Sequence, residues 1–262
     1  MAKYQALFLD IDGTILKPDH TYDESTKDAI KQARNNGVEV FLATGRPLHE
    51  ISELADELDV HSFIGYNGAL AIYKDEVIVN EPMQESTIHQ FLQIAEKNNH
   101  DIVLYTSEKN YFNSLDKPEV KGFIEAFNLQ KNDVFTSEYA DKILGATLIN
   151  LKDEDPALYE IDSAYHFSQV NVDGLRHCYD VIRDSVNKGR AIIEILKLLN
   201  IPIENAIAFG DGLNDKEMLQ VVGAGFAMGN ANPKLFEYAK YQTTSVEENG
   251  IFNGLKTIGL VK

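Results

Sequence analysis

The sequence contains a single cysteine, Cys178, and no long apolar run. One cysteine cannot form an intramolecular disulfide or a Cys-x-x-Cys metal site, and this scarcity is typical of a reducing compartment. We therefore expect Cys178 to be a small buried apolar residue and not a nucleophile. The absence of an apolar run of about 18 residues argues against a transmembrane helix, and the N-terminal residues do not match a secretory signal peptide. Together these features predict a cytoplasmic protein.

Positive charge is also scarce, since 24 lysines and arginines stand against 41 aspartates and glutamates and give a formal net charge of -17. Long-range repulsion at this charge opposes binding to nucleic acid and to anionic membrane surfaces, so we expect neither partner. A phosphorylated ligand would have to be held by a local cluster of positive groups or by a metal ion.

What the sequence does contain is an alternation of strand-like and helix-like segments in its first third. Apolar strands are predicted near residues 4–11, 38–44 and 62–73, and helices near 24–36 and 48–59. The alternation resumes near residue 187, with a helical apolar stripe followed by a strand that ends at Gly210. Strands that alternate with helices form a parallel sheet with helices on its faces. The expected fold class is therefore α/β, with a Rossmann-like parallel-sheet core.

The middle of the chain has a different pattern. Residues 83–183 contain two helix-like stretches among short strand-like pieces that follow one another directly. Strands next to strands indicate antiparallel pairs, so we expect a separate α+β domain of ordinary size. The predicted organisation is a core formed by residues 1–82 and 184–262, with this domain inserted over 83–183. Its two joints, near Pro82 and Asp184, would act as hinges.

Polar residues gather where the predicted core strands end. Asp10 and Asp12 follow the first strand, "TGR" (44–46) follows the second, and "GDGLND" (210–215) ends a later one. In open α/β sheets, ligands bind outside the carboxyl ends of the strands. Lys188 stands where a helix would begin, and both a lysine and a helix N-terminus favour an anion. Each motif alone is more typical of a turn or a solvated helix end. Their joint occurrence favours a functional site.

Four segments resemble the motifs of a known family: "LFLDIDGT" (7–14), "LATGRP" (42–47), "NKGRAI" (187–192) and "FGDGLNDKEML" (209–219). They are similar to the four motifs of the haloacid dehalogenase-like phosphohydrolases. The insertion resembles, in position and size, the α/β cap of the Cof-type subgroup. Three further segments extend the similarity: "NGA" (67–69), "GFAMGNANPKL" (225–235) and "ENGI" (248–251). The resemblance implies a catalytic core for phosphate ester hydrolysis and a cap domain that selects the substrate.

The two aspartates after the first strand have different roles in this chemistry. We expect Asp10 to attack the phosphate ester and form an aspartyl-phosphate, which would divide one difficult displacement into two easier steps. We expect Asp12 to be the general acid toward the leaving alcohol and then the general base toward water. Mg²⁺ prefers oxygen ligands, which Asp10, the main-chain carbonyl of Asp12 and Asp211 would provide. Asp215 is better placed as a supporting partner of these ligands.

The phosphoryl oxygens also require positive charge and hydrogen-bond donors. Lys188 supplies a point charge, and the Thr44 hydroxyl, the Gly45 amide and the Asn214 side chain can orient these oxygens. The sequence leaves Arg46 open between a place at the site and a structural ion pair.

The resemblance implies hydrolysis of a small phosphorylated metabolite, with sugar phosphates the leading class and pyridoxal phosphate or nucleotides behind. Core motifs fix the reaction but not the leaving group.

A dehalogenase is disfavoured because those relatives lack the second aspartate, which Asp12 supplies here. A phosphomutase would use the same residues, and a non-catalytic phospho-ligand binding module is a further alternative; both remain open. "GAGFAMG" (223–229) departs from a dinucleotide fingerprint, so NAD binding is rejected. No feature of the sequence indicates the oligomeric state.

Overall fold

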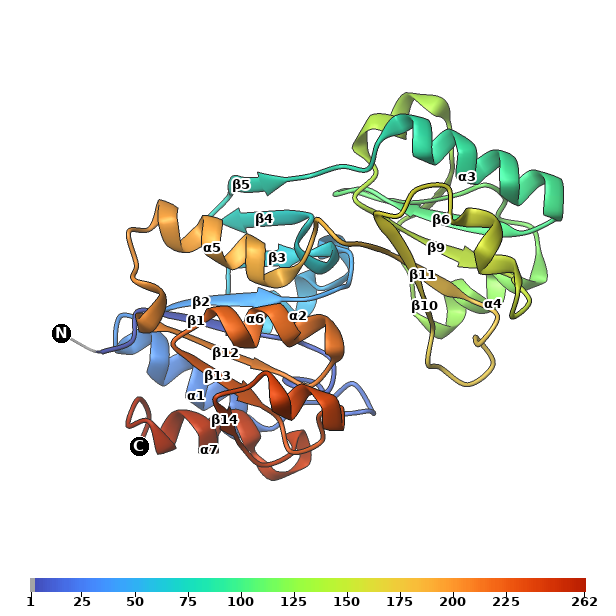
Figure 1. Cartoon of the computed structure of the whole chain (residues 1–262). Coiled ribbons are helices and arrows are strands. Elements are labelled where there is room, and N and C mark those ends of the chain that lie inside the picture. The colour runs from blue at the N-terminus through green and yellow to red at the C-terminus, as the bar shows by residue number, and fades with distance from the viewer. Residues whose placement is uncertain (1–2) are drawn as a thin grey trace. The chain divides into compact units, whose positions relative to one another are not determined.

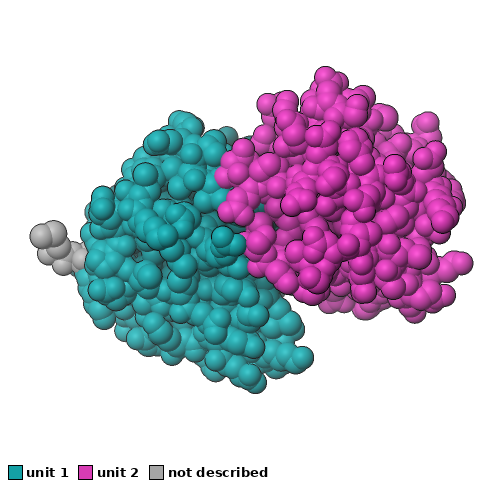
Figure 2. Space-filling model, turned by 45° about the horizontal axis from the view of Figure 1, so that its top comes forward, with its two compact units in different colours: residues 1–46, 51–79, 187–262 teal, residues 47–50, 80–186 magenta. Residues whose placement is uncertain are grey.

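The computed structural model describes residues 3–262 and divides them into two compact units, which Figures 1 and 2 show. The core unit comprises residues 3–46, 51–79 and 187–262, and the insertion unit comprises residues 47–50 and 80–186. Each unit has its own sheet and its own buried apolar clusters. Among residues 3–262, no helix combines the length and the apolar character that crossing a membrane requires.

The core unit is built on an eight-stranded sheet. Its strands are β1 (Ala6–Leu9), β2 (Glu39–Ala43), β3 (Ser62–Gly65), β4 (Leu70–Tyr73), β5 (Glu76–Asn80), β12 (Ala206–Gly210), β13 (Ala224–Ala227) and β14 (Tyr241–Gln242). They lie in the order β14-β13-β12-β1-β2-β3-β4-β5, and β1 is parallel to both of its neighbours. The pairing of β3 with β4 is antiparallel. The predicted α/β class with a parallel-sheet core is confirmed.

Helices cover both faces of this sheet. They are α1 (Glu24–Asn35), α2 (Ser52–Leu58), α5 (Lys188–Leu198), α6 (Lys216–Val221) and α7 (Gly250–Thr257). Ile192 of α5 and Met218 of α6 belong to a buried cluster with Phe8 of β1 and Ala208 of β12. The next residue of β12, Phe209, lies against α7. Because neighbouring residues of a strand point to opposite faces, α7 covers the face that α5 and α6 leave open. α1 contacts α2 and α7 and lies with them.

The insertion unit holds a six-stranded sheet with one helix on each face. Its strands are β6 (Asp101–Tyr105), β7 (Asn110–Phe112), β8 (Asn132–Val134), β9 (Gly145–Ile149), β10 (Tyr165–Gln169) and β11 (Tyr179–Arg183), in the order β10-β11-β9-β6-β7-β8. All these pairings are antiparallel except that of β7 with β8. Phe91 of α3 (Glu85–Asn98) packs in the cluster of Leu104, whereas Phe123 of α4 (Pro118–Ala126) packs in that of Val103. The antiparallel α+β pattern expected for the insertion is confirmed.

Residues 47–50 differ from the sequence expectation. A single helix was predicted near 48–59, but the structure has a short 3₁₀ turn over Leu48–Glu50 and then α2 from Ser52. The break falls where the chain passes between the units, because residues 47–50 cluster with the insertion unit. Apolar periodicity could not reveal it, since Leu48 and Ile51 continue the helical spacing that leads to α2. The chain therefore passes between the units four times.

Cys178 behaves as its isolation in the sequence predicts. Its side chain is fully buried in the apolar cluster beneath α4. Burial raises the pKa of its thiol to about 12, which disfavours the nucleophilic thiolate. Cys178 is a packing residue of the insertion unit.

Candidate active site

Three neighbouring strands of the core sheet end at the same edge and carry the predicted site residues just beyond their ends. Leu9 of β1 pairs with Leu42 of β2 and with Phe209 of β12. This parallel register brings residues 10–12, 44–46 and 211–215 to one edge of the sheet. Lys188, the first residue of α5, reaches the same edge, because its Nζ lies 2.6 Å from Asp10 Oδ1.

Lys188 is a fully buried cation between two carboxylates. Its Nζ donates to Asp10 Oδ1 and to Asp215 Oδ1, each at 2.6 Å. Burial alone would lower the pKa of this ammonium group, but the charges of Asp10 and Asp215 outweigh burial and raise the pKa. Lys188 is therefore charged, and an ammonium group has three donors, of which two are used here.

Asp10, Asp211 and Asp215 form a cluster of carboxylates whose nearest oxygens lie within 4.8 Å of one another. Burial raises the pKa of Asp10 well above its usual range, Asp215 adds to this rise, and Lys188 opposes it. Burial and the charge of Asp215 raise the pKa of Asp211 to about 7. These raised pKa values reflect the cost of ionising three carboxylates around one buried ammonium group. When all three are ionised, the cluster has an excess of negative charge that a further cation would neutralise.

The oxygen atoms of this cluster fit a hard divalent cation such as Mg²⁺. Asp215 already uses both of its oxygens, because Oδ1 accepts from Lys188 and Oδ2 accepts from the main-chain N–H groups of Asp211 and Gly212 at 3.0 Å. Asp10 and Asp211 are therefore the side chains best able to hold the ion. The structure thus gives Asp215 a distinct position, as the acceptor that fixes both Lys188 and the turn carrying Asp211.

Asp12 points its carboxylate toward Arg46 and not toward the carboxylate cluster. Arg46 Nε donates to Asp12 Oδ2 at 2.8 Å, and Nη2 donates to Oδ1 at 2.5 Å. Asp12 can then contribute to a metal site only through its main-chain carbonyl. The sequence left Arg46 open between a place at the site and an ion pair. Both apply, because Arg46 forms its ion pair with Asp12, a residue of the predicted site.

Asn67 joins two of the predicted phosphate-binding segments, a role that the sequence did not assign. Its main-chain N–H donates to the Thr44 carbonyl at 3.1 Å, and its Oδ1 accepts from Asn214 Nδ2 at 3.0 Å. A Cβ added to Gly45 would lie 3.0 Å from Asn67 Oδ1. The φ of Asn67 is +55°, a left-handed conformation that asparagine tolerates better than most residues. The "NGA" motif was the sequence feature that could have indicated this role.

Asn230 is a second residue whose role was missed. Its Nδ2 donates to the Gly13 carbonyl at 2.8 Å, and its Oδ1 accepts from the Val246 N–H at 2.8 Å. Gly13 has a φ of +74°, and a Cβ there would collide with the Asp211 carboxylate. Only glycine allows the turn after Asp12 to pass this close to Asp211. Asn230 holds that turn in place. The segment "GNAN" after β13 was the sequence feature that could have indicated this role.

Comparisons with known proteins agree with the fold and with the motif segments. A model of the haloacid dehalogenase-like hydrolase family matches residues 7–255. The chain is 33% identical over 263 residues to the putative phosphatase YkrA of Bacillus subtilis, with 98% of each chain covered. It is 29% identical over 270 residues to the 5-amino-6-(5-phospho-D-ribitylamino)uracil phosphatase YitU of the same organism, with 95% of each covered.

A solved structure is similar over both units. The sugar phosphatase BT4131, described as a member of subclass IIB, has a TM-score of 0.83 and 26% sequence identity to this chain. The match covers 98% of this chain and 100% of that one. The similarity therefore includes the insertion as well as the four motif segments.

Proposed function

The chain belongs to the haloacid dehalogenase-like hydrolases, and we propose that it is a Mg²⁺-dependent phosphatase of small phosphorylated metabolites, most of all sugar phosphates. The observation that carries the proposal is the buried Lys188 between Asp10 and Asp215, with Asp211 beside them. A nucleophilic carboxylate can attack a phosphate dianion only where fixed positive charge offsets their repulsion. This cluster offers the nucleophile, one fixed cation and a place for a second.

In the first step, an oxygen of Asp10 attacks phosphorus. A bond from phosphorus to Asp10 forms as the ester P–O bond breaks, and Asp12 gives a proton to the leaving oxygen. In the second step, Asp12 takes a proton from water, the water oxygen attacks phosphorus, and the bond to Asp10 breaks. Inorganic phosphate is released, and Asp10 is a carboxylate again.

The phosphoryl oxygens are held by other residues of the site during both steps. Lys188 provides the point charge, and Thr44, Gly45 and Asn214 provide oriented donors. Asp10, the Asp12 carbonyl and Asp211 would hold Mg²⁺, which would supply positive charge against the negative charge that develops on the phosphoryl group.

Metal removal tests this assignment. We expect a chelator to abolish phosphate release and added Mg²⁺ to restore it. Asp211→Asn should weaken Mg²⁺ binding by at least about tenfold, because an amide oxygen replaces a charged ligand. Calorimetric titration with Mg²⁺ measures this directly, without turnover. Asp28→Asn, on the exposed side of α1, is the control and should bind Mg²⁺ normally. Full activity in excess chelator would reject the metal site.

The insertion unit is proposed to be the cap that selects the substrate. One row of polar side chains in its sheet favours a sugar phosphate as that substrate. Tyr105, Thr147 and Asp180 lie on β6, β9 and β11, which are neighbours in its sheet. Tyr105 Oη lies 2.9 Å from Thr147 Oγ1, which donates to Asp180 Oδ1 at 2.6 Å. Asp180 remains exposed, and a carboxylate beside two hydroxyls is a suitable acceptor for sugar hydroxyl groups.

Asp180→Ala should therefore reduce selectivity without damaging the chemistry. A hydrogen bond to a charged group is worth about 1.5–3 kcal/mol, so kcat/KM for the best sugar phosphate should fall by about tenfold or more. Hydrolysis of p-nitrophenyl phosphate should change by less than about twofold, because its leaving group offers no hydroxyl to Asp180. Steady-state kinetics on both substrates, with Asp173→Asn in an exposed loop as the control, decides this. An equal loss on both substrates would contradict the assignment.

A panel of phosphometabolites assayed with Mg²⁺ for release of inorganic phosphate tests the function as a whole. A phosphomutase would return an isomeric phosphate ester and depend on a bisphosphate activator. A binding module would bind phosphorylated ligands and release no phosphate. The expected partner is a small phosphorylated metabolite, and the single cysteine favours a reducing compartment such as the cytoplasm.

A further inference from the structure

Arg46 stands at the point where the chain leaves the core unit. Its guanidinium group donates to both carboxylate oxygens of Asp12, at 2.8 and 2.5 Å, and its main-chain N–H donates to Thr44 Oγ1 at 3.0 Å. The next residue, Pro47, already belongs to the insertion unit. Arg46 thus contacts the proposed acid–base residue with its side chain and is joined to the insertion unit by a peptide bond.

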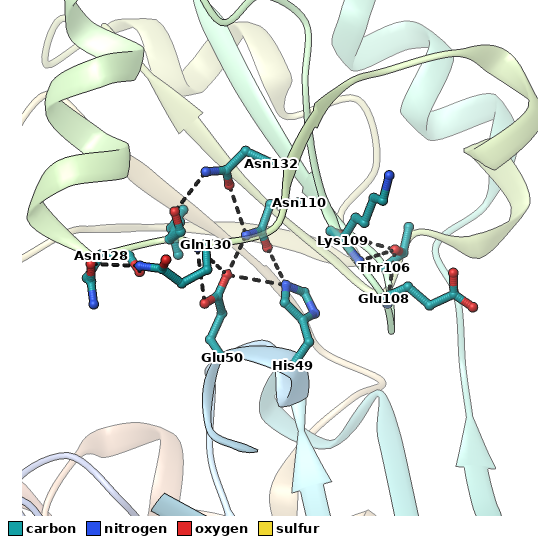
Figure 3. A network of polar contacts seen from close by, with 10 residues as sticks. His49, Glu50, Thr106, Glu108, Lys109, Asn110, Asn128, Gln130 and Asn132 are labelled. Atoms are coloured by element: carbon teal, nitrogen blue, oxygen red, sulfur yellow. Dashed lines mark hydrogen bonds and ion pairs between the residues drawn. The ribbon is translucent and has the colours of Figure 1, made fainter. Parts of the chain in front are cut away.

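Residues 47–50 are held within the insertion unit by a buried polar network, shown in Figure 3. Asn110 of β7 donates its Nδ2 to Glu50 Oε1 at 2.7 Å, and its Oδ1 lies 3.1 Å from His49 Nε2. The main-chain N–H of Gln130 donates to both oxygens of Glu50, at 3.2 and 3.3 Å. Asn132 Oδ1 accepts a further bond from Asn110 Nδ2 at 3.2 Å. Glu50 and Asn110 are thereby the centre of the network.

The network is much less exposed than the ion pair that precedes it. The side chains of His49 and Glu50 are 3% and 9% exposed, and Asn110 is fully buried. Burial lowers the pKa of His49, which disfavours a positive charge beside Glu50. The Glu50 carboxylate is therefore held mainly by N–H groups of amides, and breaking these bonds would leave a buried carboxylate without partners, at a high cost in free energy. The side chains of Arg46 and Asp12 are 33% and 53% exposed, and an ion pair at such exposure is weak. If the insertion unit moves, residues 47–50 should move with it, and the Arg46–Asp12 pair should break first.

We infer that Arg46 is a positioning residue for Asp12, and that the network around Glu50 and Asn110 ties this positioning to the insertion unit. This inference rests on the proposed role of Asp12 in hydrolysis. An exposed aspartate can rotate about both side-chain torsions, whereas two bonds from a planar guanidinium group fix the plane of its carboxylate. The Arg46 main chain is bonded to the core unit at both ends, because its N–H donates to Thr44 Oγ1 and its carbonyl accepts from the Tyr66 N–H. Displacement of residues 47–50 would strain these bonds and loosen the hold of the Arg46 side chain on Asp12.

The test uses the leaving group as a reporter of Asp12. The ester oxygen of a sugar phosphate must be protonated as the sugar leaves, whereas p-nitrophenolate leaves without a proton. Arg46→Ala should slow single-turnover release of a sugar by about 10–10²-fold, the loss typical of a misplaced catalytic group. Single-turnover release of p-nitrophenolate should be nearly unchanged. Because Asp12 also activates water, p-nitrophenyl phosphate should now give a burst of product before slow phosphoenzyme hydrolysis.

Arg46→Lys should recover only part of the rate, because an ammonium group cannot make the paired contact. Arg34→Ala is the matched control, since Arg34 forms an exposed ion pair with Asp59 elsewhere in the core unit. It should leave both leaving-group rates unchanged. Equal slowing of both substrates by Arg46→Ala, or a change confined to KM, would overturn the positioning role and indicate direct substrate binding.

Glu50→Gln tests the link to the insertion unit. With the glutamine oxygen in the place of Oε1, the amide NH2 group replaces Oε2 and faces the Gln130 N–H, which is also a donor, so residues 47–50 should loosen. We expect the same dependence on the leaving group as in Arg46→Ala, at smaller amplitude. Lys109→Ala is the control, because Lys109 is next to Asn110 in the chain but its ammonium group donates to Asp133. A folded Glu50→Gln variant with unchanged kinetics would disprove the coupling. Absence of phosphate release from the unaltered chain would instead reject the proposed function.

Discussion

Asparagine at position 10 is expected to abolish turnover, with kcat reduced by at least about 10⁴-fold. The amide nitrogen and oxygen of asparagine are poor nucleophiles, so no aspartyl-phosphate should form. The substitution preserves the shape of the side chain, and Lys188 should keep its bond to Asp215, which is 2.6 Å long in the unaltered chain. The site should therefore remain folded. Acid quenching with a labelled phosphate ester, followed by mass analysis of the protein, measures the phosphoenzyme directly.

Asp12→Asn is the contrast to this variant, since it keeps the nucleophile. It should lose proton transfer only, which is typically worth about 10²–10⁴-fold. With p-nitrophenyl phosphate it should still form the phosphoenzyme and hydrolyse it slowly. Phosphoprotein modified at position 10 in the Asp10→Asn variant would show that the mechanism is wrong.

Removal of Lys188 is expected to have the second-largest effect, on both stability and rate. Lys188→Met leaves the carboxylates of Asp10 and Asp215 buried without their partner, and breaking a buried ion pair in this way costs about 3–5 kcal/mol of unfolding free energy. The loss of a fixed charge at the phosphoryl group should also lower kcat by about 10²–10³-fold. Urea unfolding at neutral pH, with phosphate release assayed on the folded variant, measures both.

The loss of stability should depend on pH. Burial raises the pKa of Asp10 above its ordinary value of 3.8, and Lys188 opposes that rise. Without Lys188 the folded-state pKa of Asp10 should rise further. A carboxyl group with a raised folded-state pKa binds more protons when folded than when unfolded, so stability falls as pH rises above the unfolded value. The destabilisation of Lys188→Met should therefore be small near pH 4 and increase toward neutral pH.

Two further variants check the cause. Lys197→Met changes an exposed lysine of the same helix and should alter stability little at any pH. Asp215→Asn combined with Lys188→Met removes one of the orphaned charges and should recover part of the lost stability. A destabilisation of Lys188→Met that is independent of pH would mean that lost packing, and not the orphaned carboxylates, is its cause.

The positions of Asp10 and Lys188 were predictable from the sequence because they depend on regular elements. The apolar strand before Asp10 and the helix that begins at Lys188 have clear local patterns. Parallel strands place their carboxyl ends at one edge, so residues that follow β1, β2 and β12 had to meet there. The family motifs were therefore found where the fold required them.

Other contacts of the site were not predictable in this way. Asn67 and Asn230 lie in turns, and each bonds to a segment far away in the chain, at Asn214 and Gly13. Turn sequences specify local conformation but not the distant partner. The ion pair of Arg46 with Asp12 was left open for the same reason, since the sequence alone does not fix the direction of a long side chain.

The sequence by itself determined the α/β core, the inserted α+β segment and the family, because periodicity and motif order are local properties of the chain. The tertiary structure decided which groups donate to the supporting carboxylate Asp215, namely Lys188 and the main-chain N–H groups of Asp211 and Gly212. It also decided that residues 47–50 leave the core unit, although their apolar spacing continues that of α2. Their position depends on bonds from Glu50 to Asn110 and Gln130, which are 60 and 80 residues away in the chain. Such contacts arise only when distant segments pack together, and no local pattern encodes them.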